Sequence, residues 1–169
     1  LTSLKGMGSL DDVLLSSIII RDNIALKNLE GLEGVNGLTK ELIIINNSSL
    51  KDFKGLENIS RISDLRVEDN KALKDFKGLY DCRIYNIFIE NNSSLESLSP
   101  NLSAKKQMHY LNIINNPSLL NIKGLESVDQ ILSLTIKNNN SLSTLDGLDN
   151  VLKFNSRFDI IENTSLIDY

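Results

Sequence analysis

The chain has few of the residues on which disulfides and most metal centres depend. Of its 169 residues, one is cysteine (Cys82), one is histidine (His109) and none is tryptophan. A lone cysteine excludes an internal disulfide and a cysteine-based zinc site, and a lone histidine excludes the paired histidines of most catalytic metal sites. Stability must therefore come from packing, and no metal or cofactor is expected.

The sequence also lacks a charge excess of one sign and long apolar runs. Eighteen basic residues against 22 acidic ones leave a formal net charge of −4, which gives no broad attraction to nucleic acid or anionic lipid. The longest apolar runs, such as Ile18–Ile20 and Leu42–Ile45, are far too short to span a bilayer. No nucleic-acid partner and no direct membrane insertion are therefore expected, and no Gly-rich phosphate loop is found.

What the sequence does contain is one motif repeated along its whole length. "IINNSSLKDFKG" at residues 44–55 and "IENNSSLESLSP" at residues 89–100 are two copies, and their second asparagine recurs at spacings of 22 to 24 residues. The reference asparagines are Asn23, Asn47, Asn70, Asn92, Asn116, Asn139 and Asn163. The repeat predicts a single domain over residues 1–169, built from about seven coils, with both ends cut within a repeat.

Each copy follows the consensus LxIxxNxxLxxLxGLxxV, represented by Leu42, Ile44, Asn47, Leu50, Phe53, Gly55 and Leu56. The alternation before the asparagine is typical of a short half-buried strand. After the asparagine the apolar step changes to three residues, and the glycine is expected to take a positive φ or to let backbone pass closely at a corner. One copy is too small to bury its own leucines, so neighbouring copies must stack around a shared core.

Stacking predicts a solenoid in which each coil adds one strand to a parallel sheet, with a turn of helix at most between strands. Successive strands about 4.8 Å apart give a stack on the order of 30 Å long. The reference asparagines then align as a ladder where the strands end, and their side-chain amides satisfy backbone groups and one another. Their predicted role is structural.

The motif resembles the receptor L domain, the leucine-rich β-helical module of the insulin and epidermal growth factor receptors, and repetitive bacterial and fungal surface proteins with similar coils. Ordinary leucine-rich repeats place apolar residues two and five positions after the asparagine, whereas here they follow at three and six and precede Gly-Leu. The resemblance implies a leucine-rich right-handed β-solenoid, usually extracellular, that acts in recognition. Because the receptors' disulfides are missing, a prokaryotic or lower-eukaryotic surface protein is expected.

The outer sheet face is the candidate binding surface. If the residues five and three before each asparagine point inward, those six, four and two before it point outward. Two apolar groups then flank the charged residues Asp64, Arg66 and Glu68, as is typical of a partner-binding surface. The candidate partner-binding residues are Ile19, Ile43, Ile45, Arg66, Phe88, Tyr110 and Ile114. The alternative is that β-branched residues simply suit a strand surface.

Catalysis is not expected from this sequence. Right-handed β-helices include polysaccharide lyases and hydrolases with carboxylates on the sheet face, for which Asp64, Glu68 and Glu90 are the available candidates. No basic or aromatic sugar platform is predicted beside them, so these charges are interpreted as solubilising. Cys82 falls in a buried apolar column, and His109 is expected in the turn that enters a strand.

The sequence favours a recognition or adhesion module, extracellular or at the cell surface, that binds a protein or surface glycan. A structural spacer between neighbouring domains is the alternative, and a carbohydrate-binding or carbohydrate-active β-helix is a further one. The fourth copy has Pro100-Asn101 in place of Gly-Leu, followed by Lys105-Lys106-Gln107. Features individual to this protein are expected at that irregular corner.

Overall fold

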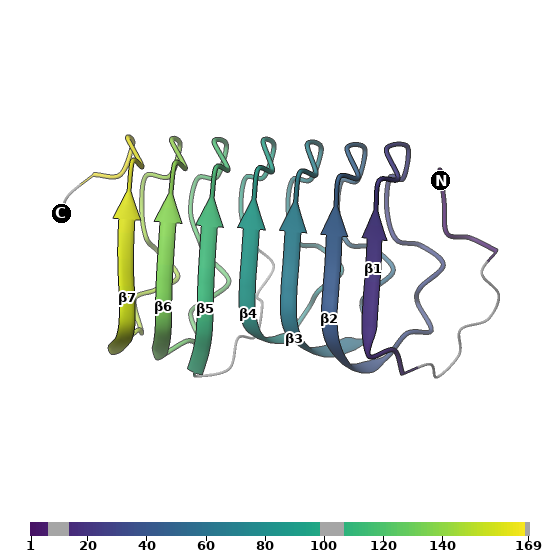
Figure 1. Cartoon of the computed structure of the whole chain (residues 1–169), viewed down its shortest axis with the longest axis horizontal. Coiled ribbons are helices and arrows are strands. Elements are labelled where there is room, and N and C mark those ends of the chain that lie inside the picture. The colour runs from purple at the N-terminus through teal and green to yellow at the C-terminus, as the bar shows by residue number, and fades with distance from the viewer. Residues whose placement is uncertain (7–13, 99–106, 168–169) are drawn as a thin grey trace.

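Seven parallel strands form one sheet in the computed structural model, which describes residues 1–6, 14–98 and 107–167. The strands are β1 (Ser17–Arg21), β2 (Gly37–Ile45), β3 (Ile59–Glu68), β4 (Arg83–Glu90), β5 (Gln107–Ile114), β6 (Gln130–Lys137) and β7 (Lys153–Ile161). They lie side by side in chain order, so β1 and β7 are the two edges of the sheet (Figure 1). No helix occurs within the described ranges.

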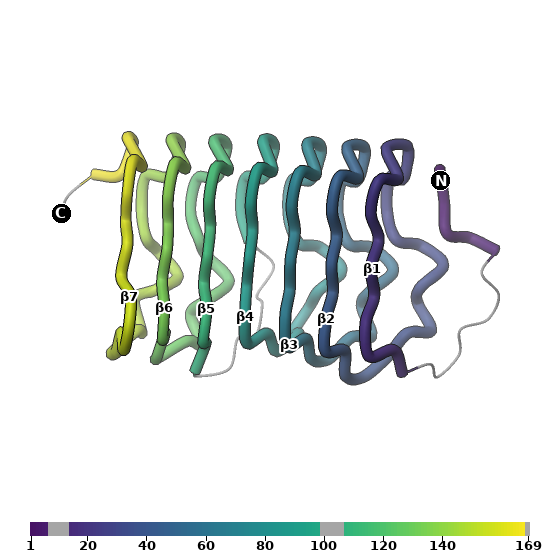
Figure 2. Tube along the Cα trace, viewed as in Figure 1, coloured from purple at the N-terminus to yellow at the C-terminus, as the bar shows by residue number. Residues whose placement is uncertain are grey.

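Where the connections are described, the chain between consecutive strands returns behind the sheet before the next strand begins (Figure 2). Each strand pairs in parallel with the strand of the following coil. Such a crossover between parallel neighbours is right-handed because a right-twisted strand packs back onto its sheet only in that way. The predicted strand-dominated, right-handed solenoid with one parallel sheet is therefore confirmed.

The core is a continuous row of apolar side chains between the sheet and the returning segments. Leu42 and Ile44 of β2 are fully buried, and so is Leu50 in the turn that follows. Between coils, Phe53 packs edge-on against Phe76 with ring centroids 5.0 Å apart. Since a fully buried leucine contributes about 1.5–3 kcal/mol, the repeated apolar columns hold the stack together without disulfides.

The reference asparagines form a hydrogen-bonded ladder where the strands end. The backbone N–H of Asn70 donates to Oδ1 of Asn92, and the backbone N–H of Asn92 donates to Oδ1 of Asn116. Both hydrogen bonds are 3.0 Å long. Nδ2 of Asn92 donates to the carbonyls of Val67 and Glu90, each at 3.0 Å. The same backbone-to-side-chain bonds start from Asn23, Asn47, Asn116 and Asn139, the last ending on Asn163. The five inner asparagines of this column are fully buried, so they hold backbone rather than a ligand.

The residue just before each reference asparagine has a left-handed conformation that the sequence interpretation missed. Its φ is 54° at Asn46, 59° at Asn91 and 56° at Asn115. Asparagine and aspartate adopt this conformation more readily than other residues with a side chain. The frequent Asp and Asn in this column therefore suit the bend.

The glycine of the Gly-Leu pair lies where two coils approach closely. At Gly78 φ is +107°, and a side chain there would overlap the backbone carbonyl of Phe53 in the preceding coil. Gly55 is placed in the same way against the carbonyl of Leu29. Both roles predicted for this glycine, a positive φ and close backbone passage, are confirmed at these corners.

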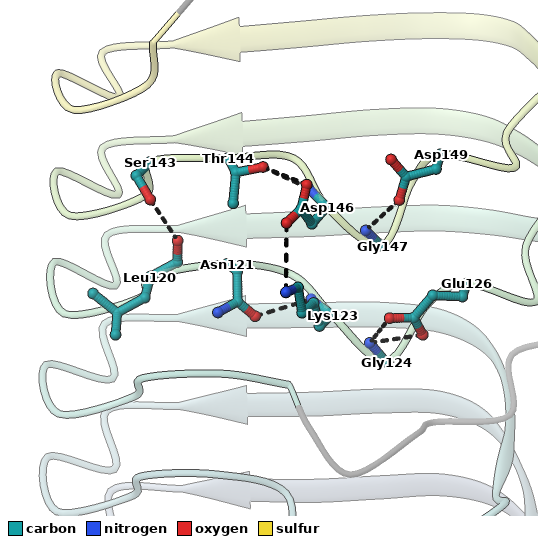
Figure 3. Close-up of polar contacts among 10 residues, drawn as sticks. All are labelled: Leu120, Asn121, Lys123, Gly124, Glu126, Ser143, Thr144, Asp146, Gly147 and Asp149. Carbon is teal, nitrogen blue, oxygen red and sulfur yellow. Dashed lines mark hydrogen bonds and ion pairs between the residues drawn. The ribbon is translucent and has the colours of Figure 1, made fainter.

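Short polar side chains cap the backbone along the same returning segments (Figure 3). Asn121 accepts the backbone N–H two residues later at 3.2 Å, and Glu126 accepts that of Gly124 at 3.0 Å. One coil further, the hydroxyl of Thr144 donates to Asp146 at 2.7 Å, and this hydrogen bond lowers the pKa of Asp146. Acidic side chains such as Glu126 and Asp146 therefore form hydrogen bonds within their own coils.

Glu30 links the coils before and after its own through two ion pairs. Its carboxylate oxygens lie 2.6 Å from Nζ of Lys5 and 2.5 Å from Nζ of Lys54. The hydrogen bonds from Lys5 and Lys54 lower the pKa of Glu30 to about 2. Glu30 therefore stays ionised in the folded chain at a pH where an ordinary glutamate is protonated.

The irregular corner singled out in the sequence lies outside the described part of the chain. It comprises Pro100-Asn101 and Lys105-Lys106, which fall in the undescribed range 99–106. Gln107, which follows it, is the first residue of β5.

Candidate functional site

The register of the sheet places the candidate residues in the three rows that their spacing predicted. The pairs are Ile19–Ile43, Ile43–Arg66 and Arg66–Phe88 in one row, Ile45–Glu68 and Glu90–Ile114 in a second, and Asn86–Tyr110 in a third. All the candidates are exposed or half-buried, whereas the intervening side chains Ile18 and Ile44 are buried. The candidates therefore share the outer face of one continuous sheet.

The isoleucines form an apolar strip over the first two strands. Ile19 is 54% exposed on β1, and Ile43 and Ile45 are half-buried on β2. Because β1 is an edge strand, Ile19 has a neighbouring strand on one side only. This strip therefore offers apolar area at the border of the face.

Arg66, Phe88 and Tyr110 make the most specific contacts among the candidates. They lie on β3, β4 and β5, with Tyr110 in the register row next to that of Arg66 and Phe88, and we call them the aromatic–arginine row. The rings of Phe88 and Tyr110 are stacked, with centroids 6.2 Å apart and an interplanar angle of 26°. The Arg66 guanidinium lies over the Phe88 ring, with its central carbon 5.3 Å from the centroid. Nη1 of Arg66 also lies 2.8 Å from Oε1 of Glu68. Ring stacking, a cation–π contact and an ion pair therefore hold the row in one arrangement.

A shallow hollow of about 280 Å³ lies beside the row, toward the carboxyl ends of the strands. Its walls include Arg66, Glu68, Phe88, Glu90 and Ile114. It combines an aromatic face, an aliphatic side chain and charges of both signs. Such a surface suits contact with another macromolecule, in which one side chain of the partner enters the hollow.

The three candidate carboxylates are arranged around these same contacts. Glu68 and Glu90 pair across β3 and β4, which separates their backbones by about 4.8 Å. Glu68 holds Arg66, and Asp64 accepts Nδ2 of Asn86 at 2.6 Å. Within residues 1–6, 14–98 and 107–167, no three His, Cys, Asp or Glu side chains gather into a metal-binding group. The interactions that the structure shows for Asp64 and Glu68 position neighbouring side chains.

Cys82 and His109 occupy contrasting environments. Cys82 is fully buried, and burial raises the pKa of its thiol to about 12, so the reactive thiolate is scarce near neutral pH. The expectation that His109 lies in a turn is wrong, because β5 already begins at Gln107. The His109 side chain is exposed on the strand, with its ring centroid 6.2 Å from that of Tyr85.

A second group of side chains lies at the beginning of β2–β5, and all of them except Asn86 lie outside the three predicted rows. It surrounds a hollow of about 310 Å³, which we call the basic hollow, lined by Leu38, Lys40, Arg61, Ser63, Tyr85, Asn86 and His109. The sequence analysis predicted no basic or aromatic sugar platform, and this group of basic and aromatic side chains was not foreseen. Apart from Asn86, these residues were missed because the strands begin earlier than six positions before the asparagine. The buried Ile62, three positions before Leu65, was the available signal that β3 extends that far.

No described segment forms a helix that is long and apolar enough to cross a bilayer. Comparison with protein-family models, with curated proteins and with solved structures finds no match to this chain. Function must therefore be argued from the sheet face, because a solenoid by itself hosts many unrelated functions.

Proposed function

We propose that this chain is a surface-exposed recognition or adhesion module that binds a partner through the outer sheet face, without catalysis. The observation that carries the proposal is the aromatic–arginine row, in which Arg66, Phe88 and Tyr110 are stacked on three adjacent strands. Tyrosine and arginine are among the residues that contribute most to binding energy in protein interfaces. Nothing in the packing of the coils requires them at these outward positions.

The geometry of the row supports binding because its side chains are already ordered. Fixing a long side chain such as arginine on association costs about 0.5–1.5 kcal/mol. Here Arg66 is held by Glu68 on one side and lies over Phe88 on the other. A partner therefore meets a surface that loses little freedom when it binds.

The surroundings of the row support a macromolecular partner. The apolar strip of Ile19, Ile43 and Ile45 lies on β1 and β2, and Ile114 lies beyond the row on β5. Charged residues lie between these apolar groups, and arginine and aromatic side chains such as those of the row are enriched in protein interfaces. A protein partner fits this surface best, with a surface glycan as the other candidate. The resemblance to receptor L domains supports an extracellular or cell-surface location.

The proposal is tested with a triple variant in which Ile43, Phe88 and Tyr110 are replaced by serine. Binding of the purified chain to a panel of cell-surface and matrix proteins, and to intact cells, would be measured by biolayer interferometry and flow cytometry. Since each anchor is worth at least about 1–2 kcal/mol, we expect about a hundredfold loss of affinity or more for any partner of this face.

The matched control replaces Ile24 and Leu120, exposed apolar residues outside the strands, with serine. This control should bind as the parent does, and both variants should keep the parent's circular dichroism spectrum. Undiminished binding by the triple variant would reject this face as the site. Binding to no panel member and no cell type would instead favour the spacer.

A further inference from the structure

The basic hollow has the composition of a ligand site distinct from the aromatic–arginine row. Lys40 on β2, Arg61 on β3 and His109 on β5 line it from three strands, and Tyr85 and Asn86 line it from β4. Its volume of about 310 Å³ lies within the range of small-molecule sites. The site is therefore large enough for a small polar ligand or one residue of a longer one.

The charge of the hollow is opposite to that of the whole chain. The formal net charge is −4, yet no carboxylate is among the residues that line the hollow. Neither Lys40 nor Arg61 forms an ion pair with any carboxylate in the described ranges. Arg61 also pairs with Arg83 on the adjacent strand, and like charges directly opposite in a sheet are destabilising. An anionic ligand would relieve this repulsion.

Asn86 adds a requirement that a simple anion does not meet. Its Nδ2 donates to Asp64 at 2.6 Å, which leaves Oδ1 as the free end of the amide. Its Oδ1 is buried and has no hydrogen-bond partner among the described atoms. A buried acceptor without a hydrogen bond destabilises the protein. A ligand hydroxyl that reaches it after a small side-chain rotation would recover that free energy, whereas sulfate has no proton to donate.

The rings of Tyr85 and His109 supply the remaining wall. Their centroids lie 6.2 Å apart with an interplanar angle of 53°. Two tilted rings form a corner against which the C–H face of a sugar can pack. The hollow therefore combines cationic donors, one acceptor and an aromatic wall.

We propose that the basic hollow binds an acidic saccharide. The carboxylate or sulfate of the sugar contacts Arg61 and Lys40, because the guanidinium fork matches such groups. A neighbouring hydroxyl donates to Oδ1 of Asn86, and the sugar ring packs against Tyr85 and His109. None of Arg66, Phe88 and Tyr110 lines this hollow, so the site is separate from the aromatic–arginine row on the same sheet face.

The test is a titration of the ¹⁵N-labelled chain with a hyaluronan tetrasaccharide, followed by nuclear magnetic resonance. Its glucuronate residues carry a carboxylate beside hydroxyls. We expect saturable shifts centred on the backbone amides of Tyr85, Asn86 and His109. Chitotetraose, a neutral chain of equal length, should cause no such shifts, and sodium sulfate should bind at least about tenfold more weakly, because it lacks the hydroxyl donor.

The variants separate site binding from general charge. Lys40→Gln combined with Arg61→Gln should weaken tetrasaccharide binding at least about tenfold, since charged hydrogen bonds are lost. Lys51→Gln combined with Lys71→Gln, which removes equal charge from exposed positions outside the strands, should change it less than about twofold. The serine variant of the partner-binding face should still bind the tetrasaccharide.

Four results would overturn the proposal: no binding of the tetrasaccharide, equal binding of chitotetraose, equal affinity for sulfate, or equal losses in the two double variants. Equal affinity for sulfate would reduce the site to a simple anion site. Because the serine variant leaves the hollow unchanged, failure here is distinguishable from failure of the partner-binding proposal.

Discussion

Replacing Asn92 with alanine measures how much the ladder contributes to stability. The truncation leaves the buried backbone N–H of Asn70 without its acceptor and removes the bonds from Nδ2 to the carbonyls of Val67 and Glu90. The Glu90 carbonyl keeps the N–H of Asp69 at 3.1 Å, so it is not orphaned. One orphaned donor costs about 1–3 kcal/mol and each lost hydrogen bond about 0.5–1.5 kcal/mol. We therefore expect Asn92→Ala to lower the free energy of unfolding by about 4 kcal/mol.

Asn23→Ala is the matched control because it makes the same change in the same column of the first coil. Asn23 is half-buried, and its Nδ2 donates to the carbonyl of Arg21 at 2.8 Å. Its Oδ1 accepts from the amino terminus at 3.4 Å, and it accepts from no backbone amide in the described residues. No buried donor is orphaned, so the expected loss is about 1 kcal/mol.

Urea unfolding followed by far-ultraviolet circular dichroism would measure both variants against the parent. With a slope of about 2 kcal/mol per molar urea, 4 kcal/mol lowers the midpoint by about 2 M. The slopes must agree among the three proteins, because coils of a solenoid can unfold separately. If Asn92→Ala and Asn23→Ala lose the same free energy, the reasoning from orphaned amides is refuted.

Further predictions concern the corners, the thiol and the acid response. Gly78→Ala should destabilise by at least about 2 kcal/mol in urea, whereas Gly6→Ala, with the same φ but open space around it, should cost less; equal losses would show that crowding is unimportant. Cys82, whose pKa burial raises to about 12, should resist iodoacetamide at pH 8 until urea unfolds the chain, and rapid labelling of the native protein would contradict this. The pKa of Glu30 is about 2 in the folded chain, against 4.5 for an ordinary glutamate. The stability that the Glu30 ion pairs contribute is therefore fully present above pH 4.5 and is lost as the pH falls toward 2. The stability gap between the parent and Glu30→Gln, measured by thermal unfolding, should narrow over that window, and a constant gap would exclude the ion pairs as its cause.

The sheet register is the part of the fold that repeat spacing predicts well. Ile19, Ile43, Arg66 and Phe88 occupy the same position relative to their reference asparagines, and they are paired in the sheet. The reason is physical: a ladder bond joins each coil to the next at the asparagine, so residues counted from that point stay aligned. Insertions of one or two residues between repeats are absorbed in the return segments instead.

The beginnings of the strands are the part that the spacing does not predict. In β3 the inward side chains Ile62 and Leu65 are three positions apart, which breaks the two-residue alternation of an ideal strand. The pairing is also irregular between Gly37 and Leu38 of β2. Pattern recognition from alternation therefore stops too early. For this reason it misses the basic hollow and places His109 outside its strand.

A repeat fold separates the demands of structure from those of function more cleanly than most folds do. Equivalent residues of the coils have nearly the same backbone environment, so packing favours the same kind of side chain at each equivalent position. The inward positions have such side chains, for example Leu50 and its fully buried equivalents. The outward row changes instead from isoleucine at Ile43 to Arg66 and Phe88 over adjacent strands. Since stacking cannot account for that change, binding should be sought where equivalent residues differ in chemistry, and both proposed sites lie at such positions on β1–β5.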